Sequence, residues 1–176
     1  MRRSNGVIYL IICVLWIGAI FLFSSQNAQD SYGLSNKVAE TIGGVLFPDF
    51  SGWPYNQRQE WISGTNALLR KLAHFAEYCL LGILSTCALS ALFSARKRKG
   101  APTVFKTGML AFYPCLLVAL ADEVIQISSA GRTSSTADVI LDCVGVVVGI
   151  FIAVSKIQAK PVAPAQSAVV RKHRRG

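Results

Sequence analysis

Residues 139–155 read VILDCVGVVVGIFIAVS, an apolar run that contains one ionisable residue, Asp142. A helix rises about 1.5 Å per residue, so this run would extend ~25 Å, close to the ~30 Å hydrocarbon core of a bilayer. Backbone groups in lipid must find their hydrogen-bond partners within the segment, which predicts a transmembrane helix. Ionisable residues inside a span are costly and commonly functional, so Asp142 marks a candidate site.

Three other segments have the same apolar character, at about Val7 to Phe23, Leu72 to Phe93 and Gly108 to Ile127. The whole chain is 52% hydrophobic and only 15% charged, whereas a soluble domain has about 25% charged residues. We therefore expect an all-α fold, a polytopic membrane bundle of four transmembrane helices. The first run is longer than the apolar part of a signal peptide, which favours an uncleaved helix.

Lysine and arginine gather at the N-terminus, between residues 96 and 106, and from Lys156 onward. By the positive-inside rule, this pattern places both termini in the cytoplasm. The net charge is +9, but the basic runs adjoin spans, so we expect membrane lipids as partners and no nucleic acid. The predicted organisation is a transmembrane domain over residues 1–156 and a basic, disordered cytoplasmic tail over residues 157–176.

One long segment, residues 24–70, separates the first two spans and is predicted to be external. Its middle, residues 43–55, mixes aromatic side chains with Gly and Pro, a composition typical of the membrane interface. We expect an interfacial segment that lies on the bilayer surface as a lid or collar, with an amphipathic helix at Gln57 to Leu69. A mobile connector is an equal alternative for its first half.

Small residues indicate how the spans pack. Gly145 and Gly149 form a Gly-x-x-x-Gly pair on one stripe with Asp138 and Asp142, so another helix can approach closely there. A second copy of the chain is one candidate for that helix, which would make a homodimer. Pro114 is expected to kink the third span and open a cleft toward the outside. The five cysteines lie in spans without a Cys-x-x-Cys pair, so we expect packing roles.

Polar side chains concentrate at the predicted outer ends of the spans. On the second span, Lys71, His74 and Tyr78 share one helix face by their spacing. Carboxylates and an amide end the third span and begin the fourth, and an arginine lies in the turn between them. The candidate pocket residues are Ser25, Gln26, Lys71, His74, Glu77, Tyr78, Asp122, Glu123, Gln126, Arg132, Asp138 and Asp142.

This polar set has more than one interpretation. Lys71 and Arg132 could neutralise the carboxylates in a purely structural network, or the set could form an external ligand site. If a hard divalent cation binds, the candidate ligands are Asp122, Glu123, Asp138 and Asp142. His74 or Glu77 would then be the candidate general acid or base. No motif of known catalytic geometry is present, so enzymatic activity stays open and no cofactor is predicted.

Three motifs resemble the VanZ-like family over nearly the whole chain. They are FSSQ at residues 23–26, Lys71-x-x-His74-x-x-x-Tyr78, and Asp122-Glu123-x-x-Gln126 followed by Arg132, Asp138, Asp142 and Gly145. The resemblance implies a small bacterial multi-pass membrane protein with a role in the cell envelope. It also implies no cofactor and no established reaction, and the founding member is associated with resistance to the glycopeptide teicoplanin. Many members have Asn at the position of Asp142, so this chain adds a negative charge there.

Together these patterns predict a protein of the bacterial cytoplasmic membrane with an outward-facing polar pocket. The pocket is expected to bind or modify an amphipathic envelope molecule, such as a lipid or lipoglycopeptide. Lys71, His74 and Arg132 would hold its phosphate or carboxylate. The alternatives are a metal-assisted enzyme that acts on a lipid-linked substrate and a structural membrane subunit.

Overall fold

The computed structural model describes residues 3–25, 28–95, 103–128 and 136–159, and all regular structure in these ranges is helical. The elements in chain order are α1 (Arg3–Ser24), α2 (Ala28–Leu46), the short 3-10 helix η1 (Phe50–Gly52), α3 (Tyr55–Ala95), α4 (Val104–Ser128) and α5 (Thr136–Gln158). Four of them, α1, α3, α4 and α5, are long and apolar enough to cross a membrane. The predicted all-α bundle with four candidate spans is therefore confirmed.

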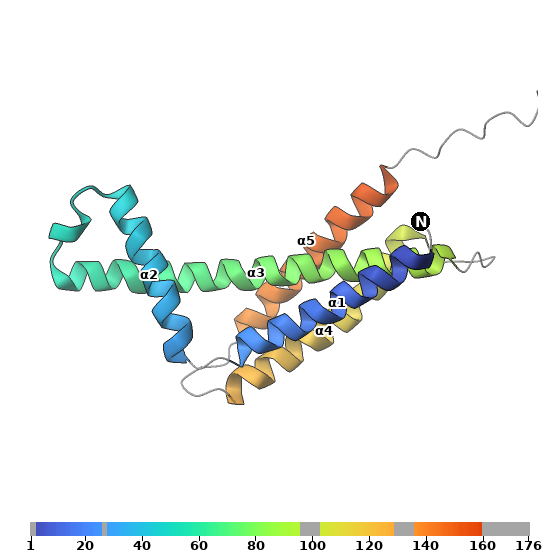
Figure 1. Cartoon of the computed structure of the whole chain (residues 1–176), viewed down its shortest axis with the longest axis horizontal. Helices are drawn as coiled ribbons and strands as arrows, with labels where there is room; N and C mark the ends of the chain where they lie inside the picture. Colours follow the sequence, from blue (N-terminus) through green and yellow to red (C-terminus); the bar gives the residue numbers. More distant parts are fainter. Residues whose placement is uncertain (1–2, 26–27, 96–102, 129–135, 160–176) are drawn as a thin grey trace, which may run out of the picture.

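The long helix α3 is the centre of the structure, and α1, α2, α4 and α5 all pack against it (Figure 1). Residues from all four candidate spans form one hydrophobic core, which includes Ile20 of α1, Leu81 of α3, Ala119 of α4 and Val146 of α5. Many of the large apolar side chains on the outer faces of these helices are exposed, as expected for helices that face lipid. All five cysteines are free thiols, which agrees with a packing role.

Glycines allow α3 and α5 to touch backbone to backbone. A Cβ atom added at Gly145 would lie 2.6 Å from the carbonyl oxygen of Phe75, and one at Gly82 would lie 2.5 Å from the carbonyl oxygen of Val146. At Gly149 an added Cβ would overlap the carbonyl oxygen of Cys79. The close approach predicted from the Gly-x-x-x-Gly pair is real, but its partner is α3 of the same chain. In this structure α3 covers both Gly145 and Gly149.

The second span is longer than the sequence indicates. We placed its start near Leu72, but α3 has 41 residues and begins at Tyr55. At 1.5 Å per residue this helix is ~61 Å long, about twice the thickness of a hydrocarbon core. The segment from Gln57 to Leu69 is helical, as expected, and it is the continuous first part of α3. Figure 1 shows this part of α3 extending beyond the other spans.

A small helical hairpin forms around the extended part of α3, where we expected a lid, a collar or a mobile connector. α2 crosses α3, and their contact buries Ala39 and Ile62 beside Phe50 of η1. The Phe47 ring packs edge-to-face against Trp61, with 5.0 Å between the ring centroids, and the Asn66 side chain donates a 2.5 Å hydrogen bond to Asn36. The sequence of α2 carries several glycines, which disfavour a helix in isolation. Its helical structure thus depends on this tertiary packing.

The glycine contact gives a first testable prediction. Gly149→Ala should lower the stability of the protein by about 1–3 kcal/mol, because the new methyl group forces α5 away from α3. Gly18→Ala is the matched control, since Gly18 also lies inside a helix but has no atom within 4 Å of an added Cβ. Thermal unfolding in detergent, followed by tryptophan fluorescence, measures both variants. Equal melting temperatures for the two would contradict the packing described.

Candidate functional site

The candidate site lies at one end of the bundle, where α1 and α4 end and α5 begins; we call this the polar end. Three polar residues from three helices are almost completely buried there. Tyr78 of α3 and Asp122 of α4 are each 0% exposed, and Asp142 of α5 is 2% exposed. Two carboxylates in an apolar bundle are expensive unless they are paired or bind a cation, so this arrangement is a functional candidate.

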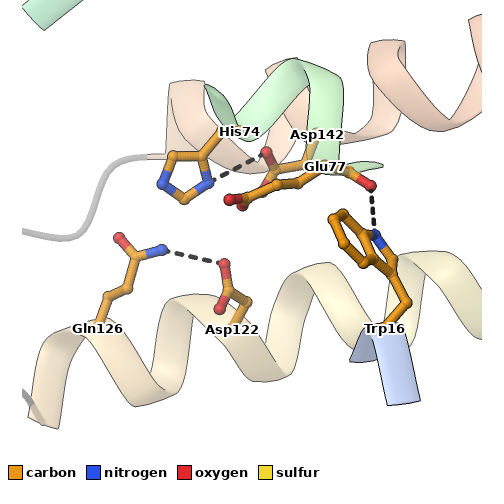
Figure 2. Close-up of polar contacts among 6 residues, drawn as sticks. All are labelled: Trp16, His74, Glu77, Asp122, Gln126 and Asp142. Atoms are coloured by element: carbon orange, nitrogen blue, oxygen red, sulfur yellow. Dashed lines mark hydrogen bonds and ion pairs between the residues drawn. The ribbon is translucent and has the colours of Figure 1, made fainter. Parts of the chain in front are cut away.

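Three of the predicted site residues converge on one point between the helices, as Figure 2 shows. The Nδ1 atom of His74 lies 3.6 Å from Oδ1 of Asp142, within ion-pair distance but too long for a hydrogen bond. One ligand atom each from His74, Asp122 and Asp142 lie within 4.8 Å of one another. We call these three residues the buried triad. The arrangement follows from the α3–α5 contact, since His74 directly precedes Phe75, whose carbonyl faces Gly145, and Asp142 lies about one turn before Gly145.

Gln126 orients one member of the triad. Its Nε2 atom donates a 3.0 Å hydrogen bond to Oδ2 of Asp122, one helical turn earlier on α4 (Figure 2). The other carboxylate oxygen, Oδ1 of Asp122, has no hydrogen-bond partner, and neither does the hydroxyl of Tyr78. Polar atoms buried in this way normally find a partner, and each exception calls for an explanation. Both atoms belong to side chains at the centre of the site.

Glu77 borders the triad from α3. Its carboxylate is close enough to His74 for an electrostatic interaction, and Figure 2 draws it beside Asp142. The backbone carbonyl of Glu77 accepts a 3.0 Å hydrogen bond from the indole Nε1 of Trp16. This contact fixes α1 against α3 at the depth of the site, and the sequence did not point to Trp16 as a contributor.

A cavity of about 160 Å³ lies between α3, α4 and α5 above the triad. Its polar lining includes four residues of our predicted set, namely Lys71, His74, Gln126 and Asp138. It also includes Arg70, which we had not predicted. The remaining lining residues are Ala67 and Leu141. His74 belongs to both the cavity and the triad, so it connects the two.

Other predicted residues lie elsewhere. Ser25 is exposed, and its hydroxyl donates a 2.8 Å hydrogen bond to the carbonyl of Leu22, which completes the end of α1. Glu123 is half-buried and belongs to neither the triad nor the cavity lining. Gln26 and Arg132 fall outside the described residues.

The structure also changes the predicted set of metal ligands. We expected Asp122, Glu123, Asp138 and Asp142, because carboxylates attract hard cations. Among the described residues, the group that can share one ion is instead His74, Asp122 and Asp142. Helix geometry explains the difference, since Glu123 follows Asp122 by about 100° around α4 and turns away from α5.

Pro114 lies beside a second cavity. It lies inside α4 without ending the helix, and it lines an apolar cavity of about 260 Å³ between α1, α3 and α4. This cavity shares no lining residue with the polar one. From Pro114 to Gln126 the distance along α4 is ~18 Å. The two cavities are therefore separate.

Arg70 is the main site residue that the sequence reading missed. Ala67, Arg70, Lys71 and His74 follow an i, i+3, i+4, i+7 spacing, which is one face of a helix. The pattern is visible in the sequence, but it becomes informative only if the helix extends before Leu72. Our placement of the second span hid it, because Arg70 was then assigned to a loop.

The helices and the site define a class, a multi-pass helical membrane protein with a buried ionisable cluster at one end. A family model described as VanZ/LLP1 matches residues 8–157. The chain therefore belongs to the VanZ/LLP1 family, as the motifs indicated, and the match includes every helix of the bundle. Neither the curated proteins nor the solved structures contain a match to this chain.

The unpartnered hydroxyl of Tyr78 leads to a prediction about stability. Tyr78→Phe should leave the melting temperature almost unchanged, because removing a buried polar atom that has no partner is nearly neutral. Tyr78→Ala should cost about 3–5 kcal/mol, because it removes a buried ring and leaves a cavity. Thermal unfolding of both purified variants makes the comparison. A loss in Tyr78→Phe as large as that in Tyr78→Ala would show that the hydroxyl has a structural partner.

Proposed function

We propose that this VanZ/LLP1 family protein binds, and in doing so presents or modifies, the anionic headgroup of an amphipathic envelope molecule. The observation that carries the proposal is the polar cavity lined by Arg70, Lys71 and His74. Three groups with N–H donors converge on it, and such groups form charge-assisted bonds with phosphate or carboxylate. The carboxylate of Asp138 on the opposite wall would bind hydroxyl or amine groups of the same molecule.

The size of the cavity limits what can enter. A volume of about 160 Å³ has room for several water molecules, which is comparable to one phosphate or carboxylate with its substituents. A whole lipoglycopeptide is much larger. We infer that one charged group of the ligand enters the cavity, while its acyl chain stays against the exposed apolar faces of the spans, such as those of Ile140 and Val144.

We further propose the orientation in the membrane. Lys106 and Lys156 are exposed at the end of the bundle opposite to the polar end, beside the start of α4 and the end of α5. Basic residues beside spans favour the cytoplasmic side. The polar end, the cavity and the hairpin of α2 and α3 would then face outward from a bacterial cytoplasmic membrane, and both termini would be cytoplasmic. An outward cavity at this depth meets lipid headgroups of the outer leaflet.

Lipid binding tests the proposal. In native mass spectrometry of the full chain in detergent, phosphatidylglycerol should bind better than phosphatidylcholine, because only the former carries a net negative charge. Lys71→Gln should reduce phosphatidylglycerol binding about tenfold, since a hydrogen bond to a charged group contributes about 1.5–3 kcal/mol. Lys106→Gln is the matched control, because it removes an exposed lysine at the opposite end. Equal losses in both variants would leave only non-specific charge attraction and overturn the proposal.

The family relationship suggests a cellular readout. Expression of the chain in a teicoplanin-susceptible bacterium should raise the minimum inhibitory concentration of teicoplanin if the envelope ligand is the drug or its target. Lys71→Gln should abolish the increase, whereas Lys106→Gln should preserve it. Membrane levels of each variant are measured by immunoblot in parallel. An unchanged inhibitory concentration with abundant wild-type protein would exclude the glycopeptide as a ligand. The lipid-binding experiment would still test the headgroup proposal separately.

A further inference from the structure

The buried triad has a charge imbalance that its protein contacts do not resolve. Two aspartates, Asp122 and Asp142, are buried there. Among the described residues, the one ion pair that either of them makes is that between Asp142 and His74. Even a protonated His74 would balance only one of the two carboxylates. Lys71 lines the cavity above and forms no ion pair with Asp122 or Asp142 among the described residues. A buried carboxylate without a counter-charge costs several kcal/mol, so a further cation would stabilise this end of the bundle.

The donor atoms have the chemistry and spacing of a metal site. The triad offers one imidazole nitrogen and two carboxylate oxygens, all within 4.8 Å of one another. In a tetrahedral zinc site, bonds of about 2.0–2.2 Å place two ligand atoms roughly 3.3–3.6 Å apart. The 3.6 Å separation between His74 Nδ1 and Asp142 Oδ1 lies at this value. The ligand atom of Asp122, whose side chain is 0% exposed, lies within 4.8 Å of the other two.

A second, independent observation points to the same place. Oδ1 of Asp122 and the hydroxyl of Tyr78 are buried without a hydrogen-bond partner, whereas Nδ1 of His74 and Oδ1 of Asp142 have only each other, at ion-pair distance. Two polar atoms from α3 and α4 thus lack a hydrogen-bond partner here, and one of them, the hydroxyl of Tyr78, lies outside the triad. The other oxygen of Asp122 is held by Gln126. Such a hydrogen bond from a neighbour is how metal-ligating carboxylates are commonly oriented.

We propose that His74, Asp122 and Asp142 bind a divalent transition-metal ion such as Zn²⁺ or Mn²⁺ at the base of the polar cavity. Mixed imidazole and carboxylate ligands favour these ions over Ca²⁺, which prefers six or more oxygen ligands. Three protein ligands leave at least one coordination position for a further ligand. Because His74 also lines the cavity, that ligand would come from the cavity, and an anionic oxygen is the group that suits it.

Metal analysis of the full chain tests this inference. The protein is purified in detergent, treated with EDTA, incubated with Zn²⁺ or Mn²⁺, freed of excess metal and measured by plasma mass spectrometry. The expected content is about one ion per chain for wild type. Asp142→Asn, Asp122→Asn and His74→Gln keep the side-chain shapes and should each weaken binding at least about tenfold. Asp138→Asn and Glu123→Gln are the matched controls, since both carboxylates lie at the same end but outside the triad.

A measurement on wild type alone covers the case in which the triad variants do not fold. Added Zn²⁺ should raise the melting temperature of the EDTA-treated protein, because a ligand that binds only the folded state stabilises it. The control variants should show the same increase. An unchanged melting temperature together with negligible bound Zn²⁺ and Mn²⁺ would overturn the proposal, as would full metal content in Asp142→Asn.

The same samples separate this inference from the proposed headgroup binding. Phosphatidylglycerol binding is measured with and without EDTA treatment. Binding that depends on the metal would show that the ion holds the headgroup. Binding that persists in the metal-free protein would leave Lys71 and Arg70 as the anion contacts. The metal content would then still show whether the triad binds an ion. Failure of lipid binding with one bound ion per chain would refute the headgroup proposal alone.

Discussion

The structure depends on the direct contact between the backbones of α3 and α5. Gly82 on α3 and Gly145 and Gly149 on α5 each face a carbonyl of the other helix, at distances that a Cβ atom would not allow. This approach brings His74 and Asp142, which lie beside the contact, to within 3.6 Å. It also defines the wall between the polar cavity and the core. Larger residues at these glycines would separate the helices, and the site would separate with them.

The second constraint is the burial of two carboxylates in an apolar bundle. Asp122 and Asp142 come from different helices, and the hydrophobic core lies directly beneath them. Charges in such a place persist only when other groups stabilise them, and His74 and Gln126 do so in part. The remaining requirement for positive charge is the physical reason to connect this site with a metal ion. The charge of that ion would in turn attract an anionic headgroup from the cavity above it.

The hairpin formed by α2, η1 and the extended part of α3 adds a feature outside the apolar bundle. Its own core of aromatic rings, with Phe47, Phe50, Trp53 and Trp61 in mutual contact, makes it a small packed unit. Because α3 is continuous, this unit is joined rigidly to the helix that carries Arg70, Lys71 and His74. A ligand or partner that contacts the hairpin would therefore act on the cavity through one helix.

The sequence by itself determined the four apolar helices, the family and most of the polar residues, because span length, charge and the Asp-Glu-x-x-Gln motif are local properties. It also identified the glycines that permit a close helix contact, since their spacing is visible along one helix. Only the tertiary structure decided which helix covers them, namely α3 of the same chain. The tertiary structure likewise decided which carboxylates meet, because this depends on how three helices are rotated about their axes. Those beside His74 are Asp122 and Asp142, rather than Glu123 or Asp138. α2 also required tertiary packing, because its glycines disfavour a helix in isolation. Only the structure showed that the helix expected at Gln57 to Leu69 continues into the second span as α3.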